Sequence, residues 1–286
     1  MPDDITNHGV LLGRNHTDFV AGELVGVLPY EIRNTSGNWK PYSIREEVQR
    51  NANGDTMACV SFSANNAIEM QIKYQTGVEI NLSDRWLAKM SNTTPYGNWL
   101  DVVANTLRTL GAVEEAVWPA PPDYTWQTYY SSIPADIQAR GAEFLKKWNI
   151  AYEWVPVSPE SIRHHLKHAP LQVILPGHAV VQILNEADMM EYFDSYEPFI
   201  KRRAQNAITD ALKIVLTPKE YTMAKVLNDN GTIRVEFGSG PSGFNIGIAS
   251  SSLFQQIQAS GEPILVQPAS TPERMTLSDG TILHRK

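Results

Sequence analysis

The chain has 286 residues, of which 42% are hydrophobic, and a formal net charge of −7. This length allows one large domain, or a medium domain with a small appendage, around an ample core. The negative charge argues against nucleic acid or an anionic membrane surface as a partner, because both attract basic patches. The densest basic cluster is only Lys201-Arg202-Arg203.

The chain contains a single cysteine, Cys59, and no apolar stretch of about 18 residues that could span a membrane. One cysteine cannot form an intramolecular disulfide, so packing must hold the fold, and a reducing compartment is compatible with it. The first residues lack the basic and then apolar segments of a secretion signal. We therefore expect a cytoplasmic protein, or a virion protein if a phage encodes it.

Residues 1–50 are rich in Gly, Asn and Pro and predict an extended N-terminal arm packed on a body. Helical patterns follow at about 57–75, 83–90 and 98–110, the last closed by Gly111. The first of these helices carries one apolar stripe, formed by Val60, Ala64, Ala67, Ile68 and Ile72. This part of the chain is predicted to be mainly α-helical.

After the proline-rich stretch at 119–122, a further helix is predicted from Pro134 to about Trp148. The periodicity then changes to that of strands, with one short helix among them. The expected strands cover 150–157, 171–175, 179–184 and 190–193, and the helix covers 158–168. We interpret the second half as an antiparallel meander, which makes the fold class α+β.

Residues 218–286 predict a small, mostly β C-terminal extension that follows a domain at 51–217. Its expected elements are strands at 222–227, 232–237, 244–248 and 264–267, a helix at 251–259 and a hairpin turn at 278–280. Two roles remain open for this extension. It either packs on the preceding domain or offers a docking surface for a homo-oligomer or larger assembly.

The position of Cys59 suggests a nucleophile. A glycine-containing loop, Asn53-Gly54-Asp55-Thr56-Met57-Ala58, leads directly into the helix that Cys59 begins. Unpaired N–H groups and the positive end of a helix dipole stabilise a thiolate in the first turn. The sequence therefore predicts a pKa for the Cys59 thiol below its usual value.

Four short segments, in order, resemble motifs of the papain-like cysteine peptidases over about residues 28–216. Gly54, Cys59, Phe62 and Ser63 match the segment around the family's nucleophile, and Asn81-Leu82-Ser83 resembles the opening of its second helix. Gly177-His178-Ala179-Val180 is similar to the histidine motif. Tyr192-Phe193-Asp194-Ser195-Tyr196 is similar to the Asn-Ser-Trp segment that follows it.

The resemblance implies an active-site cleft between an α-rich half and an antiparallel β-rich half. Cys59 would be the nucleophile, His178 the base and Asp194 the orienting group, where the family has Asn. The backbone N–H of Cys59 would hold the oxyanion together with a side-chain amide six residues earlier. That position holds Asn53, one methylene shorter than the family's Gln, and Gln49 is the alternative donor.

The activity that this resemblance implies is hydrolysis of peptide or isopeptide bonds in a polypeptide substrate, through an acyl-thioester and without a cofactor or metal. Two alternatives stay open. One is a structural or binding protein that keeps the fold with weak or lost catalysis, such as a phage virion component. The other is a hydrolase of peptidoglycan amides.

Two further motifs receive structural interpretations. His164, His165 and His168 are predicted to lie on a solvated helix, because no acidic residue is adjacent and Lys167 would repel a cation. The glycines of residues 238–243 are predicted to form a hairpin loop, since the residues after them resemble a strand and offer no helix N-terminus to a phosphate.

Overall fold

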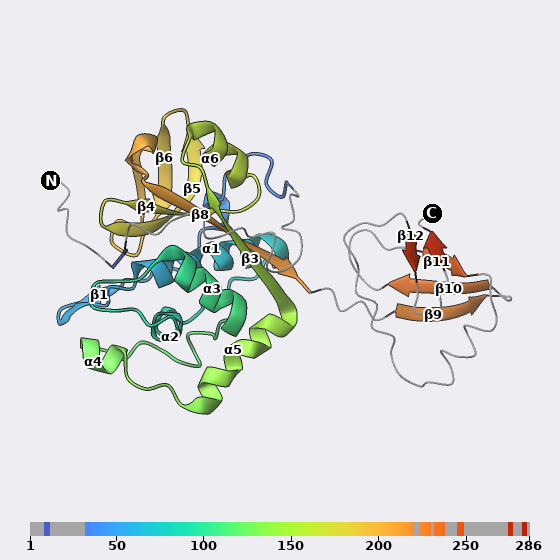
Figure 1. Cartoon of the computed structure of the whole chain (residues 1–286), viewed down its shortest axis with the longest axis horizontal. Helices are drawn as coiled ribbons and strands as arrows, with labels where there is room; N and C mark the ends of the chain where they lie inside the picture. Colours follow the sequence, from blue (N-terminus) through green and yellow to red (C-terminus); the bar gives the residue numbers. More distant parts are fainter. Residues whose placement is uncertain are drawn as a thin grey trace. The chain divides into compact units, whose positions relative to one another are not determined.

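The computed structural model describes residues 9–11 and 32–219, together with the backbone of five strands between residues 224 and 284. The chain divides into two compact units, Met1–Pro218 and Lys219–Lys286. Within the first unit most helices gather on one side and a sheet forms the other (Figure 1). The α+β class predicted from the sequence is confirmed.

The α-helices of the first unit are α1 (Cys59–Thr76), α2 (Asp84–Met90), α3 (Leu100–Leu110), α4 (Trp126–Tyr129), α5 (Ala135–Lys147) and α6 (Pro159–Leu166). Five of them begin and end close to the predicted positions, whereas α4 was not predicted. The Ser83 and Ser158 side chains cap α2 and α6 by accepting hydrogen bonds from the N–H groups of Trp86 and Ser161. Two short 3-10 helices, η3 (Lys40–Tyr42) and η4 (Gln205–Ala207), lie in the connecting segments.

The sheet of the first unit has six antiparallel strands. They are β3 (Trp148–Val155), β4 (Leu171–Leu175), β5 (His178–Glu186), β6 (Met189–Phe193), β7 (Ile200–Ala204) and β8 (Asp210–Pro218). Their order is β3-β8-β4-β5-β6-β7, so the meander predicted from the sequence covers only β4 to β7. The sequence interpretation missed β7 and β8, and β8 returns to pair between β3 and β4.

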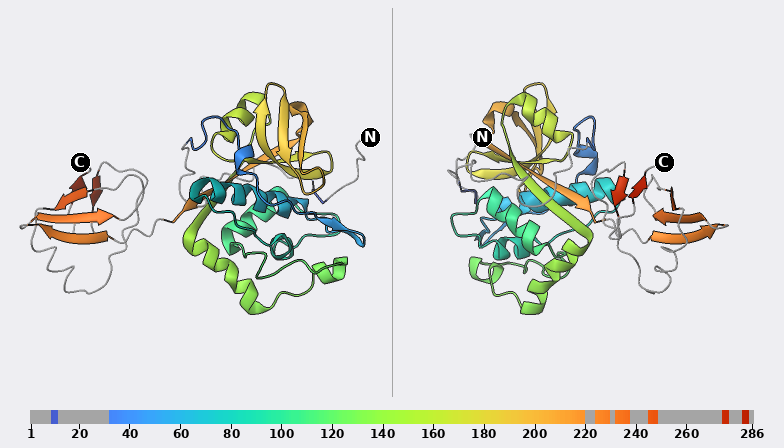
Figure 2. Two further views of the ribbon diagram at one scale, coloured as in Figure 1. Left: turned by 180° about the vertical axis from the view of Figure 1, so that it is seen from behind. Right: turned by 45° about the vertical axis from the view of Figure 1, so that its right-hand side comes forward.

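Helix α1 runs between the sheet and the other helices in both views of Figure 2. Every residue from Cys59 to Ile72 is buried, so the prediction of a single buried stripe is wrong. The polar side chains on the helix are buried with partners, as buried polar groups must be. Gln71, for example, donates to the carbonyl of Ile214 at 2.9 Å and accepts from the N–H of Leu216 at 2.9 Å.

A two-stranded hairpin, β1 (Arg50–Asn51) with β2 (Gly54–Asp55), lies just before α1. Residues 9–11 lie beside this region: Val10 forms a parallel bridge with Asn98, and Gly9 packs against Met57. A Cβ atom on Gly9 would lie 2.0 Å from the Met57 carbonyl oxygen, so only glycine fits there. The segment 9–11 therefore packs against Met57, which precedes Cys59 by two positions in the sequence.

The second unit contains two antiparallel groups of strands. β9 (Ala224–Asp229), β10 (Thr232–Phe237) and β11 (Asn245–Ile248) form one sheet, and β12 (Arg274–Thr276) pairs with β13 (Ile282–His284). The predicted helix at 251–259, the strand at 264–267, the glycine loop at 238–243 and the turn at 278–280 lie outside the described residues. Among the helices that the structure describes, none has the length and apolar character needed to cross a membrane.

Candidate active site

Cys59 is the first residue of α1, as predicted, and lies against the start of β5. The N–H of Ala179 donates to the Cys59 sulfur at 3.4 Å, although 120 positions separate the two residues in sequence. Ala179 directly follows His178, the first residue of β5. The Cys59 sulfur thus lies against the backbone of the residue that follows His178, where the buried helix meets the sheet.

The His178 ring is held by a carboxylate from the loop between β6 and β7. Its Nε2 donates to Asp194 Oδ1 at 2.6 Å, and both side chains are buried. Asp194 follows the last residue of β6, and its own N–H donates to the Phe199 carbonyl at 2.8 Å, which closes the loop between β6 and β7. The structure therefore brings the three residues Cys59, His178 and Asp194 together.

Asp194 has a second partner that the sequence interpretation missed. The ammonium group of Lys201, on β7, lies 2.8 Å from Asp194 Oδ2. Burial alone raises the pKa of Asp194, but the hydrogen bonds and charges of His178 and Lys201 outweigh it and hold that pKa below its ordinary value. Asp194 is therefore a carboxylate that is bound on both oxygens.

The pKa of the Cys59 thiol shifts in the opposite direction to that of Asp194. Cys59 has no solvent exposure, and burial raises the pKa of its thiol above the usual value. The N–H of Ala179 lowers that pKa, while the charges of Asp55 and Asp194 raise it further. The prediction of a lowered pKa at the helix start is therefore wrong, because loss of solvation exceeds the effect of the helix N-terminus.

The two candidate oxyanion donors lie in different surroundings. Asn53 is exposed at the turn between β1 and β2, and its side-chain amide donates to the Asp123 carbonyl at 2.9 Å. Gln49 is fully buried, and its amide nitrogen donates to Asp55 at 2.9 Å. The Gln49 amide oxygen accepts from the Ser195 hydroxyl at 2.7 Å, beside Asp194. The hydrogen bonds of Gln49 thus lead to Asp55 and to Ser195, the neighbour of Asp194, whereas the side-chain amide of Asn53 donates to the Asp123 carbonyl.

An aromatic ring and a second carboxylate complete the surroundings. The Tyr196 ring lies 5.2 Å from the His178 ring between centroids, and the Tyr196 hydroxyl donates to Asp55. Asp55 also accepts from the N–H of Met57 at 2.7 Å. A polar network therefore links the hairpin before the thiol with the loop that carries Asp194.

Gln172 anchors the first turn of α1 to the sheet and was also missed. This fully buried residue of β4 donates to the Val60 carbonyl at 2.8 Å and to the Ser63 hydroxyl at 2.8 Å. A single polar residue in the apolar run Leu171-Gln172-Val173-Ile174-Leu175 was a signal that could have drawn attention to it. Lys201 had no comparable local signal.

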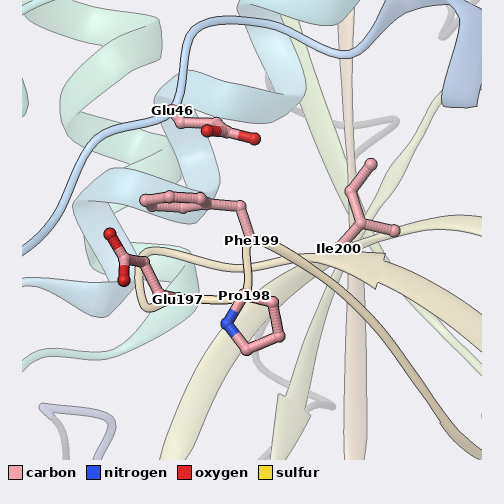
Figure 3. Close-up of a pocket in the computed structure, with 5 residues that line it drawn as sticks. All are labelled: Glu46, Glu197, Pro198, Phe199 and Ile200. Carbon is pink, nitrogen blue, oxygen red and sulfur yellow. The ribbon is translucent and has the colours of Figure 1, made fainter.

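A surface hollow of about 740 Å³ lies along the loop between Asp194 and Lys201. Figure 3 shows the Phe199 ring below the Glu46 side chain, next to the turn formed by Glu197 and Pro198. Ile200 completes the lining, which includes none of the three residues Cys59, His178 and Asp194. The hollow thus borders the loop of the candidate site and lies apart from its reacting groups.

The histidine group at 164–168 differs from the prediction. His168 is only 2% exposed, and His165 Nδ1 lies 3.1 Å from the fully buried ammonium group of Lys213. Burial and the Lys213 charge lower the pKa of His165 to about 4. In the described part of the chain, no cluster of three or more His, Cys, Asp or Glu residues could hold a metal ion.

No protein-family model matches the sequence, and the search of curated proteins gives no match. The fold is similar to solved papain-like cysteine proteases. The geometry of the three residues, and not this likeness, supports the function proposed below.

Three of the solved structures illustrate that likeness. The ragweed pollen allergen Amb a 11, in its proform, has a TM-score of 0.45 and 15% identity, with 63% of this chain and 66% of that chain covered. Digestive procathepsin L 3 of Tenebrio molitor has a TM-score of 0.46 and 16% identity, with 66% and 73% covered. Bromelain of Ananas comosus in complex with E64 has a TM-score of 0.45 and 18% identity, with 63% and 98% covered.

Proposed function

We propose that this protein is a cysteine peptidase of the papain-like kind, which cleaves peptide or isopeptide bonds of a polypeptide with Cys59, His178 and Asp194. One observation carries the proposal. The residue that donates to the Cys59 sulfur directly follows a histidine whose Nε2 is bound by the Asp194 carboxylate. A nucleophile, a base and an orienting group in this order are the arrangement that nucleophilic catalysis requires.

In the proposed reaction His178 acts through Nδ1, because Asp194 engages Nε2. As the Cys59 sulfur attacks the substrate carbonyl carbon, the thiol proton moves to Nδ1 and the carbonyl π electrons move to oxygen. The tetrahedral intermediate then expels the amine, which takes the proton from Nδ1. Water, deprotonated by His178, hydrolyses the thioester and regenerates the thiol.

The raised pKa of Cys59 decides when the proton moves. A buried thiol does not ionise alone, so transfer to His178 must accompany the attack or form a neutral thiolate–imidazolium pair. Asp194 would stabilise the imidazolium formed in either case. For the oxyanion we propose the Cys59 N–H, which has no intrahelical acceptor at the start of α1, and the Gln49 amide.

The test is the pH dependence of Cys59 alkylation by iodoacetamide, measured as the ratio of rates at pH 6 and pH 8.5. Slow access of the reagent to the buried thiol lowers both rates by the same factor and so does not change their ratio. The chain has a single cysteine, so only Cys59 is labelled. The alkylation rate of a free thiol falls roughly 100-fold from pH 8.5 to pH 6, because the thiolate fraction falls. We expect a loss of less than about tenfold in the wild type, since His178 takes the proton, and the full loss in His178→Ala.

His164→Ala is the matched control, because His164 is an exposed histidine on α6, and we expect it to behave as the wild type. Cleavage of casein should disappear in Cys59→Ser. Lysis of purified cell walls, with casein left intact, would instead indicate the peptidoglycan amide hydrolase.

The complete burial of Cys59 favours one alternative, a structural or binding protein that keeps this fold without catalysis, for example in a phage virion. In that case the wild type and His178→Ala would show the same free-thiol ratio, and casein would stay intact. That result would refute the peptidase proposal.

A further inference from the structure

The Asp194 carboxylate lies between the Lys201 ammonium group and the His178 ring, which becomes a cation when it is protonated. Oδ1 accepts from His178 at 2.6 Å and Oδ2 lies 2.8 Å from the Lys201 ammonium group. The Asp194 side chain is 4% exposed and that of Lys201 is 24% exposed. The ion pair is therefore shielded on the Asp194 side, where a charge acts more strongly than it does at the surface.

The fold fixes this contact through the hairpin of β6 and β7. Lys201 pairs with Tyr192 in the register of the two strands, and the intervening loop closes where the Asp194 N–H meets the Phe199 carbonyl. Residues alternate along β7 between exposed and partly buried, and Lys201 is on the partly buried side. The strand thus directs the Lys201 side chain toward the carboxylate.

The consequence for His178 follows from the charges. A lone carboxylate beside an imidazole favours the protonated ring strongly. Here the Lys201 charge offsets the Asp194 charge, so the pair Asp194–Lys201 presents a nearly neutral hydrogen-bond acceptor to Nε2. The orienting function is kept, while the electrostatic preference for imidazolium is reduced.

Other charged and titratable groups act on the same site. Asp194 and Asp55 both act on Cys59 and on Tyr196, and the Arg50 guanidinium lies over the Tyr196 ring at 5.0 Å. The groups around the ring and its carboxylate, on the elements that the structure describes, are Cys59, Asp55, Tyr196, Arg50 and Lys201. Lys201 contacts the Asp194 carboxylate directly, on the oxygen that His178 leaves open.

We propose that Lys201 is a positioning residue of the site, whose ammonium group holds Asp194 in place and sets the pH at which the His178 ring loses its proton. This inference rests on the proposed roles of His178 and Asp194. Lys201 acts on the ring through the Asp194 carboxylate, which its ammonium group contacts.

The experiment follows the titration of the His178 ring by NMR in the full chain, with labelled histidine and a Cys59→Ala background. Removing the thiol separates the ring's titration from that of Cys59, and His178→Ala assigns the signal. Three substitutions separate the properties of Lys201. Methionine removes the charge and the donor, glutamine keeps a donor without charge, and arginine keeps both.

We expect Lys201→Met and Lys201→Gln to raise the titration midpoint of the ring by roughly one pH unit, the effect of an uncompensated charge at short range. Lys201→Arg should leave it within about 0.3 unit. Asp194→Asn alone should lower it, because the Lys201 charge then remains without its carboxylate. The double variant Asp194→Asn/Lys201→Met should return it toward the wild type, since the two changes act on one pair.

Lys146→Met is the matched control, because Lys146 forms a 2.7 Å ion pair with Glu143 that is exposed on α5. An unchanged midpoint in folded Lys201→Met and Lys201→Gln would overturn the inference. So would a shift in Lys201→Arg as large as that in Lys201→Met. If both uncharged variants fail to fold while the arginine variant folds, Lys201 has a structural role and the inference is also wrong.

This titration does not depend on catalysis. A wild type with free-thiol alkylation and no hydrolysis would refute the proposed peptidase, even if the ring titrates as expected. A wild type with hydrolysis whose acid pH limit is unmoved in Lys201→Gln would refute only the role of Lys201, because a protonated ring cannot accept the thiol proton.

Discussion

Two buried carboxyl groups of this protein show how little burial alone says about charge. Asp194, in the sheet half, and Glu69, on α1 among the helices, are each 3% exposed. The pKa of Asp194 is lowered, whereas that of Glu69 is raised well above its usual value. Equal loss of water is therefore accompanied by opposite shifts of the pKa.

The difference comes from the neighbours. Asp194 lies between His178 and Lys201, and both favour the carboxylate. Burial dominates at Glu69, where the hydrogen bond from the N–H of Leu82 lowers the pKa and three nearby carboxylates raise it further. Those carboxylates are Glu47, Glu79 and Glu115. A buried carboxyl group thus keeps its charge where nearby donors and cations offset the loss of water, as His178 and Lys201 do at Asp194.

The largest expected effect comes from removing the charged member of this comparison. Asp194→Ala should lower kcat/KM for a peptide substrate by about 10²- to 10⁴-fold, because the imidazole loses the group that orients it. Glu69→Gln, which alters an equally buried carboxyl group, should keep activity within about twofold. Steady-state kinetics on both purified variants measures this. Equal losses in the two variants would show that burial of a carboxyl group, and not the pairing of Asp194, matters for activity.

The next effect concerns the polar network beside Asp194. Gln49→Ala should lower kcat by roughly 100-fold if its amide holds the oxyanion, while Asn53→Ala should leave kcat within about twofold. The alkylation ratio between pH 6 and pH 8.5 should stay unchanged in both variants, because alkylation forms no oxyanion. A loss of kcat in Asn53→Ala with none in Gln49→Ala would reverse the assignment.

Local signals in the sequence predicted most of the elements. Ser83 and Ser158 each cap a helix where the sequence placed its start, and the apolar run 171–175 is β4 without change. The position of β8 could not be predicted in this way. Its pairing joins residues such as Val173 and Ala211, and no local pattern encodes such a distant contact.

The same limit applies to the site. The resemblance to a family supplied His178 and Asp194 as partners of Cys59, and counting six residues back from Cys59 gave Asn53. The hairpin of β1 and β2 lies between Gln49 and Cys59, so the count placed the donor on an exposed turn. The burial that raises the pKa of Cys59 depends on the packing of α1 between two layers, which its sequence pattern did not show.

The smallest effect tests the other member of the comparison, through stability. Because the folded-state pKa of Glu69 is raised, the protonated group contributes stability at acidic pH, which is lost as pH rises through that pKa. Glu69→Gln should therefore raise the free energy of unfolding by about 1–2 kcal/mol at pH 8 and change it little at pH 4. The amide oxygen of Gln can still accept from the N–H of Leu82, as the carboxyl group does.

Denaturant unfolding at pH 4, 6 and 8 measures this effect, and Asp194→Asn should show the opposite trend. The lowered pKa of Asp194 means that its contribution is present above the unfolded pKa of about 4 and is lost as pH falls further. Asp194→Asn should thus destabilise most at neutral pH and least in acid. If Glu69→Gln instead destabilises the protein more at pH 8 than at pH 4, Glu69 is a carboxylate with a partner, and the contrast with Asp194 does not hold.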